Sequence, residues 1–292
     1  MDCVINFTPT GMIPTKQMTP HVPVTVGEIV EQVLEATEIG ITSVHLHARD
    51  YGTEIPTYRA EIYAEIIAGV RRYCKDLVIC VSTSGRTYNE YEKRAQVLWL
   101  EHELKPDMAS LTLSSVNFNK QASINSPDMI IALAQEMKNR GIVPELEVFD
   151  VGMINYARYL ETKKLIEPPY YYVLILGNIA CAQADLLHCG VMINDLPSDS
   201  IWSIGGVGNC QLMVNSLAIS VGGGVRVGLE DNIYYDPNRT KLANNIDLVK
   251  RIHRIAEANE RLIMKPSQLR KILHLESGDG SYGRVFNDTN LS

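Results

Sequence analysis

Short apolar, β-branched runs alternate along the whole chain with longer stretches in which apolar residues recur at helical spacing. Runs of the first kind predict buried strands, and the helical spacing predicts amphipathic helices. The predicted strands cover residues 4–8, 43–47, 77–82, 108–112, 143–149, 171–176, 201–204 and 225–229. The predicted helices cover residues 26–39, 58–73, 89–102, 127–140, 239–260 and 267–274, with further helices ending near residue 164 and lying near residue 210.

This order of elements predicts an α/β protein in which eight strand–helix units close into a (β/α)₈ TIM barrel. An open, doubly wound sheet is the alternative, but it would need a glycine-rich dinucleotide turn after the first strand, and Thr8-Pro9-Thr10-Gly11-Met12 lacks that pattern. We therefore expect a single barrel domain over residues 1–275 and a C-terminal arm over residues 276–292 that orders only against another surface. Residues 116–126, rich in Asn and Ser, are expected to form a flexible segment over the active face.

Composition agrees with one full-sized globular domain. The chain has 292 residues, of which 46% are hydrophobic and 21% charged, enough apolar material for a complete core and too much for a disordered chain. A prior of about 150 residues per domain favours two domains, but a barrel of about 250 residues is an established one-domain exception. The formal net charge of −7 offers no basic footprint for nucleic acid.

The location of the protein is also constrained. No apolar run approaches the roughly 18 to 20 residues of a membrane span, and the first residues do not resemble a signal peptide. The six cysteines are scattered without any CxxC pair, which is typical of reduced, packed thiols. We therefore expect a cytoplasmic protein that binds neither membranes nor nucleic acid.

Catalytic groups of a (β/α)₈ barrel lie at the carboxyl ends of its strands. His45 and His47 point to the same side because residues two apart in a strand share a face. Two imidazoles and one carboxylate form an open zinc site, although an HxH pair is also compatible with two packed core histidines. Glu230 is within reach as third ligand, and Glu145 and Glu147 are its rivals.

A charged cluster ends the eighth predicted strand, where Arg226 precedes Glu230 and Asp231. An aspartate beside a guanidinium stays ionised and oriented, which suits a general base that removes a proton next to a carbonyl. The alternative is a structural ion pair at the barrel rim.

Two further segments offer groups that bind anions. The hydroxyls and backbone N–H groups of residues 82–85 suit a carboxylate or an oxyanion, although an ordinary polar turn would look the same. A glycine cluster at residues 205–208 precedes a predicted helix, a place where phosphate binds well.

Together these motifs resemble the β-keto acid cleavage enzymes, a family best known for 3-keto-5-aminohexanoate cleavage, over almost the whole chain. The segments that carry the resemblance are PTG (9–11), VHLHARD (44–50), STSG (82–85), ELEVFD (145–150), WSIGGVG (202–208) and RVGLEDN (226–232).

The resemblance implies a Zn²⁺-dependent barrel enzyme that forms a homotetramer or another homo-oligomer. It implies the conversion of a β-keto acid and acetyl-CoA into acetoacetate and a new acyl-CoA. His45, His47 and Glu230 would bind zinc, Asp231 would be the base, and Arg226 would hold it. One of Glu145 and Glu147 would support the site, and the sequence leaves open which. The candidate substrate-binding residues are Thr10, Ser82, Thr83, Ser84, Gly85 and Thr112, and the weaker CoA-binding candidates are Gly206 and Gly208.

One position departs from the family pattern. Members acting on amino-bearing keto acids have a glutamate in the first loop, where Ile13 stands here. An ammonium facing Ile13 would lack a charge partner, so we expect a β-keto acid with a neutral or apolar side chain. The alternative functions are another zinc barrel enzyme of the amidohydrolase type, although the remaining histidines lie mostly on predicted loops and helices, and a catalytically silent binding barrel.

Overall fold

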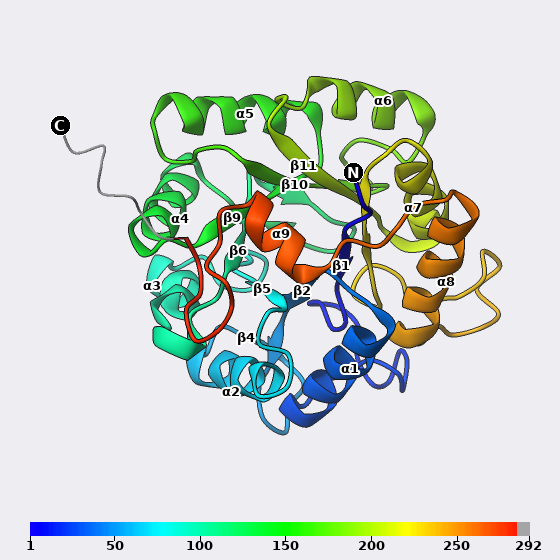
Figure 1. Cartoon of the computed structure of the whole chain (residues 1–292), viewed down its shortest axis with the longest axis horizontal. Coiled ribbons are helices and arrows are strands. Elements are labelled where there is room, and N and C mark those ends of the chain that lie inside the picture. The colour runs from blue at the N-terminus through cyan, green and yellow to red at the C-terminus, as the bar shows by residue number, and fades with distance from the viewer. Residues whose placement is uncertain (285–292) are drawn as a thin grey trace.

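A computed structural model describes residues 1–284 and confirms the closed (β/α)₈ barrel. Its strands are parallel and follow the order β1-β12-β11-β10-β9-β6-β5-β2 around the barrel, with helices outside them (Figure 1). The strands are β1 (Ile5–Phe7), β2 (Ser43–Leu46), β5 (Val78–Val81), β6 (Met108–Thr112), β9 (Val143–Val148), β10 (Tyr170–Leu176), β11 (Ser200–Gly206) and β12 (Gly224–Val227).

The helix ends follow local sequence signals. At α1, Thr25 accepts a hydrogen bond from the Glu28 N–H while the Glu28 side chain accepts from the backbone of Thr25, a complete capping box. At α4, Ser126 caps the first turn and Gly141, with φ of 64°, ends the helix in the left-handed region. The helices are α1 (Val26–Ile39), α2 (Ala60–Arg71), α3 (Tyr91–Ala95), α4 (Pro127–Arg140), α5 (Val151–Thr162), α6 (Leu186–Asp195), α7 (Gln211–Ser220), α8 (Asn245–Ala258) and α9 (Pro266–Ile272).

Two predicted helices are shorter than expected. The prediction for residues 89–102 was wrong after α3, because the chain continues as two short 3₁₀ turns and His102 has φ of 52°. The helix predicted from residue 239 begins at Asn245, because the Asp236 carboxylate accepts hydrogen bonds from the N–H groups of Thr240 and Lys241 and closes a tight loop there. Helix α6 was not predicted.

Two short hairpins project from the barrel, β3 (Ala48–Arg49) with β4 (Pro56–Thr57) and β7 (Val116–Asn117) with β8 (Ala122–Ser123). The second one lies in the segment expected as flexible. It is fixed at its base, where the Asn125 N–H donates to Ser115 Oγ and Asn178 Nδ2 donates to the Asn117 carbonyl, at 2.9 Å in both cases.

Helix α9 crosses the amino-terminal end of the barrel (Figure 1), where Asp107 collects several donors. Its buried carboxylate accepts from Arg71 at 3.3 Å, from Arg270 at 2.8 and 2.9 Å and from the Gly283 N–H at 3.2 Å. Gly283 and Arg284, in the segment expected as a C-terminal arm, thus contact the barrel, and residues 285–292 of that segment lie outside the described residues. No helix within residues 1–284 has both the length and the apolar character of a membrane span.

Candidate active site

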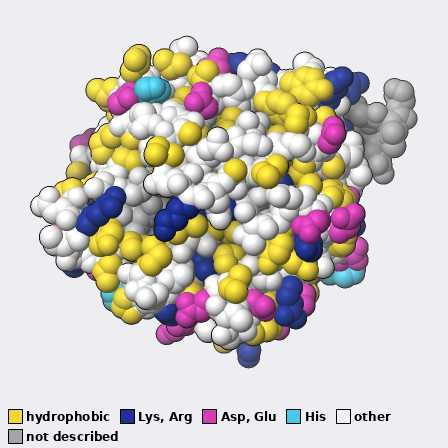
Figure 2. Space-filling model, turned by 180° about the vertical axis from the view of Figure 1, so that it is seen from behind, with side chains coloured by type: hydrophobic (Ala, Val, Ile, Leu, Met, Phe, Trp, Pro, Cys, Tyr) yellow, Lys and Arg dark blue, Asp and Glu magenta, His cyan; other side chains and the backbone are white. Residues whose placement is uncertain are grey.

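A cavity of about 980 Å³ opens at the carboxyl ends of the barrel strands. Figure 2 shows the face opposite to that of Figure 1, with basic side chains beside a hollow near its middle. The sequence-predicted site residues that line the cavity are His47, Ser82, Ser84, Thr112, Glu147, Gly208, Arg226, Glu230 and Asp231.

The paired histidines of β2 and the loop after it meet the glutamate that follows β12. His45 Nε2 lies 3.2 Å from His47 Nε2, and His47 Nε2 lies 3.1 Å from Glu230 Oε1. The three side chains offer donor atoms within 4.8 Å of one another. The barrel therefore brings together, from distant parts of the chain, the two histidines of the HxH motif and Glu230, one of the three carboxylates considered as third ligand.

His45 is oriented from below by Glu145. Its Nδ1 lies 2.5 Å from Glu145 Oε2, and the other oxygen of Glu145 accepts a hydrogen bond of 2.6 Å from Asn6. Burial opposes a charge on His45, but Glu145 and Glu230 raise its pKa to about 9. Burial lowers the pKa of His47. Glu145 thus fixes the ring so that Nε2 faces His47.

Arg226 holds three carboxylates at the mouth of the cavity. Its guanidinium lies 2.7 Å from Glu230, 2.9 Å from Asp231 and 3.5 Å from Glu147. Burial opposes ionisation of Glu230, but Arg226 and His47 hold its pKa well below the usual range. For Asp231 burial outweighs Arg226 and raises the pKa, while the contact with Arg226 fixes the orientation of the carboxylate. The raised pKa makes Asp231 a better proton acceptor when ionised.

The two glutamates of β9 occupy different depths. Both point inward, but one strand repeat separates them along the barrel axis. Glu145 lies beneath His45, whereas Glu147 lines the cavity and accepts a hydrogen bond of 2.6 Å from Thr112. Glu145 therefore contacts a candidate metal ligand, whereas Glu147 contacts the cavity.

The charges of this site fit a divalent cation. Glu145, Glu147, Glu230 and Asp231 are largely buried near Arg226, and Arg86 lines the same cavity, so four carboxylates face two guanidinium groups. Glu230 Oε2 is buried and makes no hydrogen bond within the described residues. Imidazole nitrogens and a carboxylate are ordinary zinc donors, so His45, His47 and Glu230 can hold such an ion.

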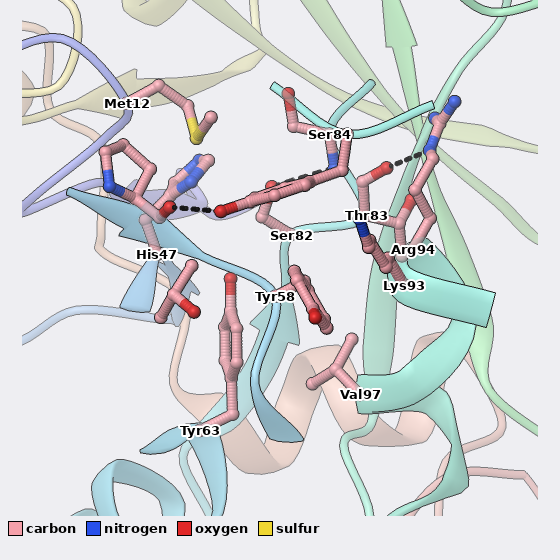
Figure 3. A pocket seen from close by; sticks show the side chains of 13 residues that line it. Met12, His47, Tyr58, Tyr63, Ser82, Thr83, Ser84, Lys93, Arg94 and Val97 are labelled. Atoms are coloured by element: carbon pink, nitrogen blue, oxygen red, sulfur yellow. Dashed lines mark hydrogen bonds between the residues drawn. The ribbon is translucent and has the colours of Figure 1, made fainter. Parts of the chain in front are cut away.

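The polar turn after β5 borders both the large cavity and a smaller pocket beside His47, and Figure 3 shows Ser82, Thr83 and Ser84 around the smaller one. Ser82 and Ser84 line the cavity beside His47. Thr83 instead donates its hydroxyl to the Ser110 carbonyl at 2.6 Å, and Gly85 lies against the carbonyl of Ile124. Thr83 and Gly85 are therefore not brought into the larger cavity.

Thr10 and the two candidate CoA-binding glycines, Gly206 and Gly208, also differ in whether they reach the cavity. Thr10 is fully buried behind it and its hydroxyl has no partner within the described residues. Gly206 lies under α7, where a Cβ would come within 2.7 Å of the Val214 side chain, so packing accounts for this glycine. Gly208 has φ of 68° and does line the cavity.

The structure adds residues for which the motifs indicated no role. Arg49 donates to the carbonyls of Gly11 and Pro14, at 2.7 and 2.9 Å, and so fixes the first loop. Arg86 and Phe118 line the cavity together; the place of Arg86 directly after the STSG motif was a signal for it, whereas Phe118 had none. An amidohydrolase would add further histidines to the site. In the described chain, none of the histidines outside the HxH motif lines the cavity; these are His21, His102, His188, His253 and His274.

Fold and site together define an enzyme of the (β/α)₈ class with a candidate metal centre next to a carboxylate placed for proton transfer. The model of the beta-keto acid cleavage enzyme family matches residues 2–275. The chain therefore belongs to the beta-keto acid cleavage enzyme family, whose members are acyltransferases that cleave carbon–carbon bonds.

Individual relatives agree with this placement. The chain is 35% identical over 276 residues to a 3-keto-5-aminohexanoate cleavage enzyme of Fusobacterium nucleatum, covering 94% of this chain and 98% of the relative. It is 34% identical over 278 residues to a 3-oxoadipate:acetyl-CoA acetyltransferase of Cupriavidus necator, covering 94% and 95%. The apo structure of ObcA shares the fold at a TM-score of 0.76 and 20% identity, over 87% of this chain and 65% of ObcA.

Proposed function

We propose that this protein is a zinc-dependent enzyme that condenses a β-keto acid with acetyl-CoA to give acetoacetate and a new acyl-CoA. The observation that carries the proposal is the meeting of His45, His47 and Glu230 beside the Arg226–Asp231 pair. Bound zinc would stabilise the negative charge of an enolate as a Lewis acid.

The side chains of this site divide the remaining work. Asp231, held by Arg226 at 2.9 Å, takes the proton from the carbon between the keto and carboxylate groups. The carbanion then attacks the thioester carbonyl of acetyl-CoA and CoA leaves. CoA adds to the original keto group, and the bond between that carbon and the carbanion carbon breaks, which releases the new acyl-CoA. The electron pair stays on the carbanion carbon, which takes the proton back from Asp231 to give acetoacetate. Ser82 and Thr112 face the cavity and bind substrate oxygens.

We also propose that amino-bearing keto acids are poor substrates. Ile13 lines the cavity, where it can make apolar contacts but cannot pair with an ammonium. Turnover of a matched pair of β-keto acids, one with an amino group and one with a methyl group at the same carbon, tests this. Preference for the amino compound contradicts it.

A metal-resolved assay tests the reaction. The protein is assayed as purified, after chelation and after zinc is restored, while acetoacetate formation from acetyl-CoA and a panel of β-keto acids is followed. We expect activity only with zinc and its loss in His47→Ala and Glu230→Ala. Stoichiometric zinc with no acetoacetate from any keto acid contradicts the proposed reaction.

We further propose that the protein acts as a cytoplasmic homo-oligomer. Six free cysteines support a reducing location. Three strongly exposed apolar side chains on α6, Leu186, Leu187 and Val191, support a contact with a second copy. Light scattering after size-exclusion chromatography measures the state, and a monomer at micromolar concentration contradicts this part of the proposal.

A further inference from the structure

Arg86 places a positive charge in the cavity that no carboxylate of the described residues contacts directly. Burial lowers the pKa of Arg86, and the nearby carboxylates of Glu230, Glu147 and Asp231, which form no ion pair with it, act in the opposite direction. The residue is half-buried and lines the same cavity as His47 and Ser82. Its backbone N–H donates to Ser84 Oγ at 3.3 Å, but within residues 1–284 its guanidinium makes no hydrogen bond and no ion pair. Because the residue is only half-buried, solvent can reach these donors, and a ligand that enters the cavity can take the place of that solvent.

An aromatic support holds this guanidinium in place. The Arg86 guanidinium carbon lies 3.5 Å from the ring centroid of Phe118, and the Phe118 ring meets Phe149 edge-on at 5.8 Å. Phe118 belongs to the β7–β8 hairpin, which Asn178 fixes from a neighbouring loop. Stacking uses the face of the guanidinium and leaves its N–H donors, which lie in the plane, available for a carboxylate.

The acidic groups of the site do not take up these donors. Glu230, Asp231 and Glu147 are already engaged by Arg226, and Glu147 also by Thr112. Arg239, another arginine of the cavity lining, donates to Asn209 at 2.8 Å. Three arginines line the cavity within the described residues. Of these, Arg86 is the one whose guanidinium is held in position while its N–H groups make no hydrogen bond.

We propose that Arg86 binds a carboxylate at the end of the substrate distant from the reacting carbons, which makes β-keto dicarboxylic acids the preferred substrate class. This inference rests on the proposed function and replaces the expectation of a neutral side chain, which considered Ile13 alone. An ammonium near Arg86 would be repelled, and an alkyl end would leave the guanidinium unpaired, so both alternatives are disfavoured.

A matched pair of substrates tests the inference. The six-carbon diacid 3-oxohexanedioate and its methyl-ended counterpart 3-oxohexanoate differ only at the distal end. We expect the wild-type enzyme to favour the diacid in kcat/KM, and Arg86→Met to reduce this preference roughly 10- to 100-fold, the range for a lost hydrogen bond between charged groups. Arg86→Lys, which keeps the charge but loses the planar fork, should give an intermediate preference. Equal melting temperatures and zinc contents of the variants exclude misfolding as the cause.

Lys120→Met is the charge-matched control, because it removes one positive charge from the exposed rim of the same cavity. A similar loss of preference in this variant contradicts a local contact at Arg86. The phosphates of CoA offer the same anionic chemistry: if Arg86→Met raises the KM for acetyl-CoA equally with both keto acids, the carboxylate assignment is overturned. Turnover of both acids with an unchanged ratio overturns the inference alone, whereas no turnover of any β-keto acid overturns the proposed function with it.

Discussion

Gly11 lies directly against Glu230, so closely that a Cβ on Gly11 would come within 2.4 Å of Glu230 Cγ. Gly11 also has φ of 66°, a conformation that other residues rarely adopt, and its carbonyl accepts a hydrogen bond from Arg49. The glycine of the first loop thus sets where the carboxylate of the loop after β12 can lie. A side chain there would displace a candidate zinc ligand.

Gly11→Ala should therefore weaken zinc binding at least about tenfold as Glu230 is pushed from the histidines, and backbone strain should cost roughly 1–2 kcal/mol of stability. Chelator competition measures the first effect and chemical denaturation the second. Gly52→Ala is the matched control, because Gly52 has φ of 72° but no atom within 4 Å of an added Cβ. Gly52→Ala should lose stability through the same backbone strain but keep its zinc affinity. Wild-type zinc affinity in Gly11→Ala would contradict the inference that Gly11 sets the position of Glu230.

Glu145→Gln should lower zinc affinity about 10- to 100-fold, because the neutral amide orients and polarises His45 less than the carboxylate does. Metal affinity is again measured by chelator competition, in the absence of substrate. Glu147→Gln removes a carboxylate from the same strand that contacts Thr112 and Arg226 rather than the histidines. If Glu145→Gln and Glu147→Gln lost the same zinc affinity, Glu145 would act only through its charge, and its role in orienting His45 would be contradicted.

Asp231→Asn should lower kcat about 10²- to 10⁴-fold, the range expected for loss of a general base. Zinc content should stay at the wild-type level, since Asp231 is not among the three candidate ligands. The discriminating measurement is exchange of the α-protons of the keto acid in D₂O, followed by NMR without acetyl-CoA. Exchange at the wild-type rate in the variant would assign the base to another residue.

The α1 capping box gives a pH-dependent contribution to stability. Burial opposes the charge of Glu28, but hydrogen bonds from Lys16, Val24 and Thr25 lower its pKa from 4.5 to about 2. A lowered pKa stabilises the fold at pH values above the ordinary pKa, and this contribution fades as the pH falls from 4.5 towards 2.

Glu28→Gln should therefore cost about 1 kcal/mol near neutral pH, a modest value because the side chain is partly exposed, and the difference from wild type should narrow below pH 4.5. Urea denaturation at a series of pH values measures it. The control is Glu31→Gln, an exposed position on the same helix, which should change stability by less than about 0.5 kcal/mol at any pH. If the difference in unfolding free energy between wild type and Glu28→Gln grew as the pH fell, the predicted direction of the pH dependence would be wrong.

The barrel could be predicted from the sequence because its elements carry local signals. Helices α1 and α4 begin and end where Thr25, Ser126 and Gly141 indicate, and β6 matches its apolar run residue for residue. Helix α6 was missed because its exposed leucines, Leu186 and Leu187, obscure the amphipathic pattern. The break of the helix predicted over residues 89–102 depends on tertiary contacts, such as the hydrogen bond from Trp99 to Glu136 of α4.

The residue types of the site could be predicted from the sequence. The position of each side chain along the barrel axis, and its burial, could not. Alternation along β9 puts Glu145 and Glu147 on one face, but only the barrel's dimensions decide which lies below His45. The pKa direction of Asp231 depends on burial, which spacing cannot give. The support of Arg86 by Phe118 joins two loops that are distant in sequence, and no local pattern announces it.

The contacts around Asp107 bear on how the loops of this enzyme can be engineered. Asp107 ties α2, β5, α9 and residue 283 together at the amino ends of the strands, while the candidate site residues gather at the opposite ends. Loops beside the cavity can be exchanged without touching this anchorage. Libraries that vary the β7–β8 hairpin and the first loop, with Gly11 kept because it sets the place of Glu230, should therefore retain foldable members.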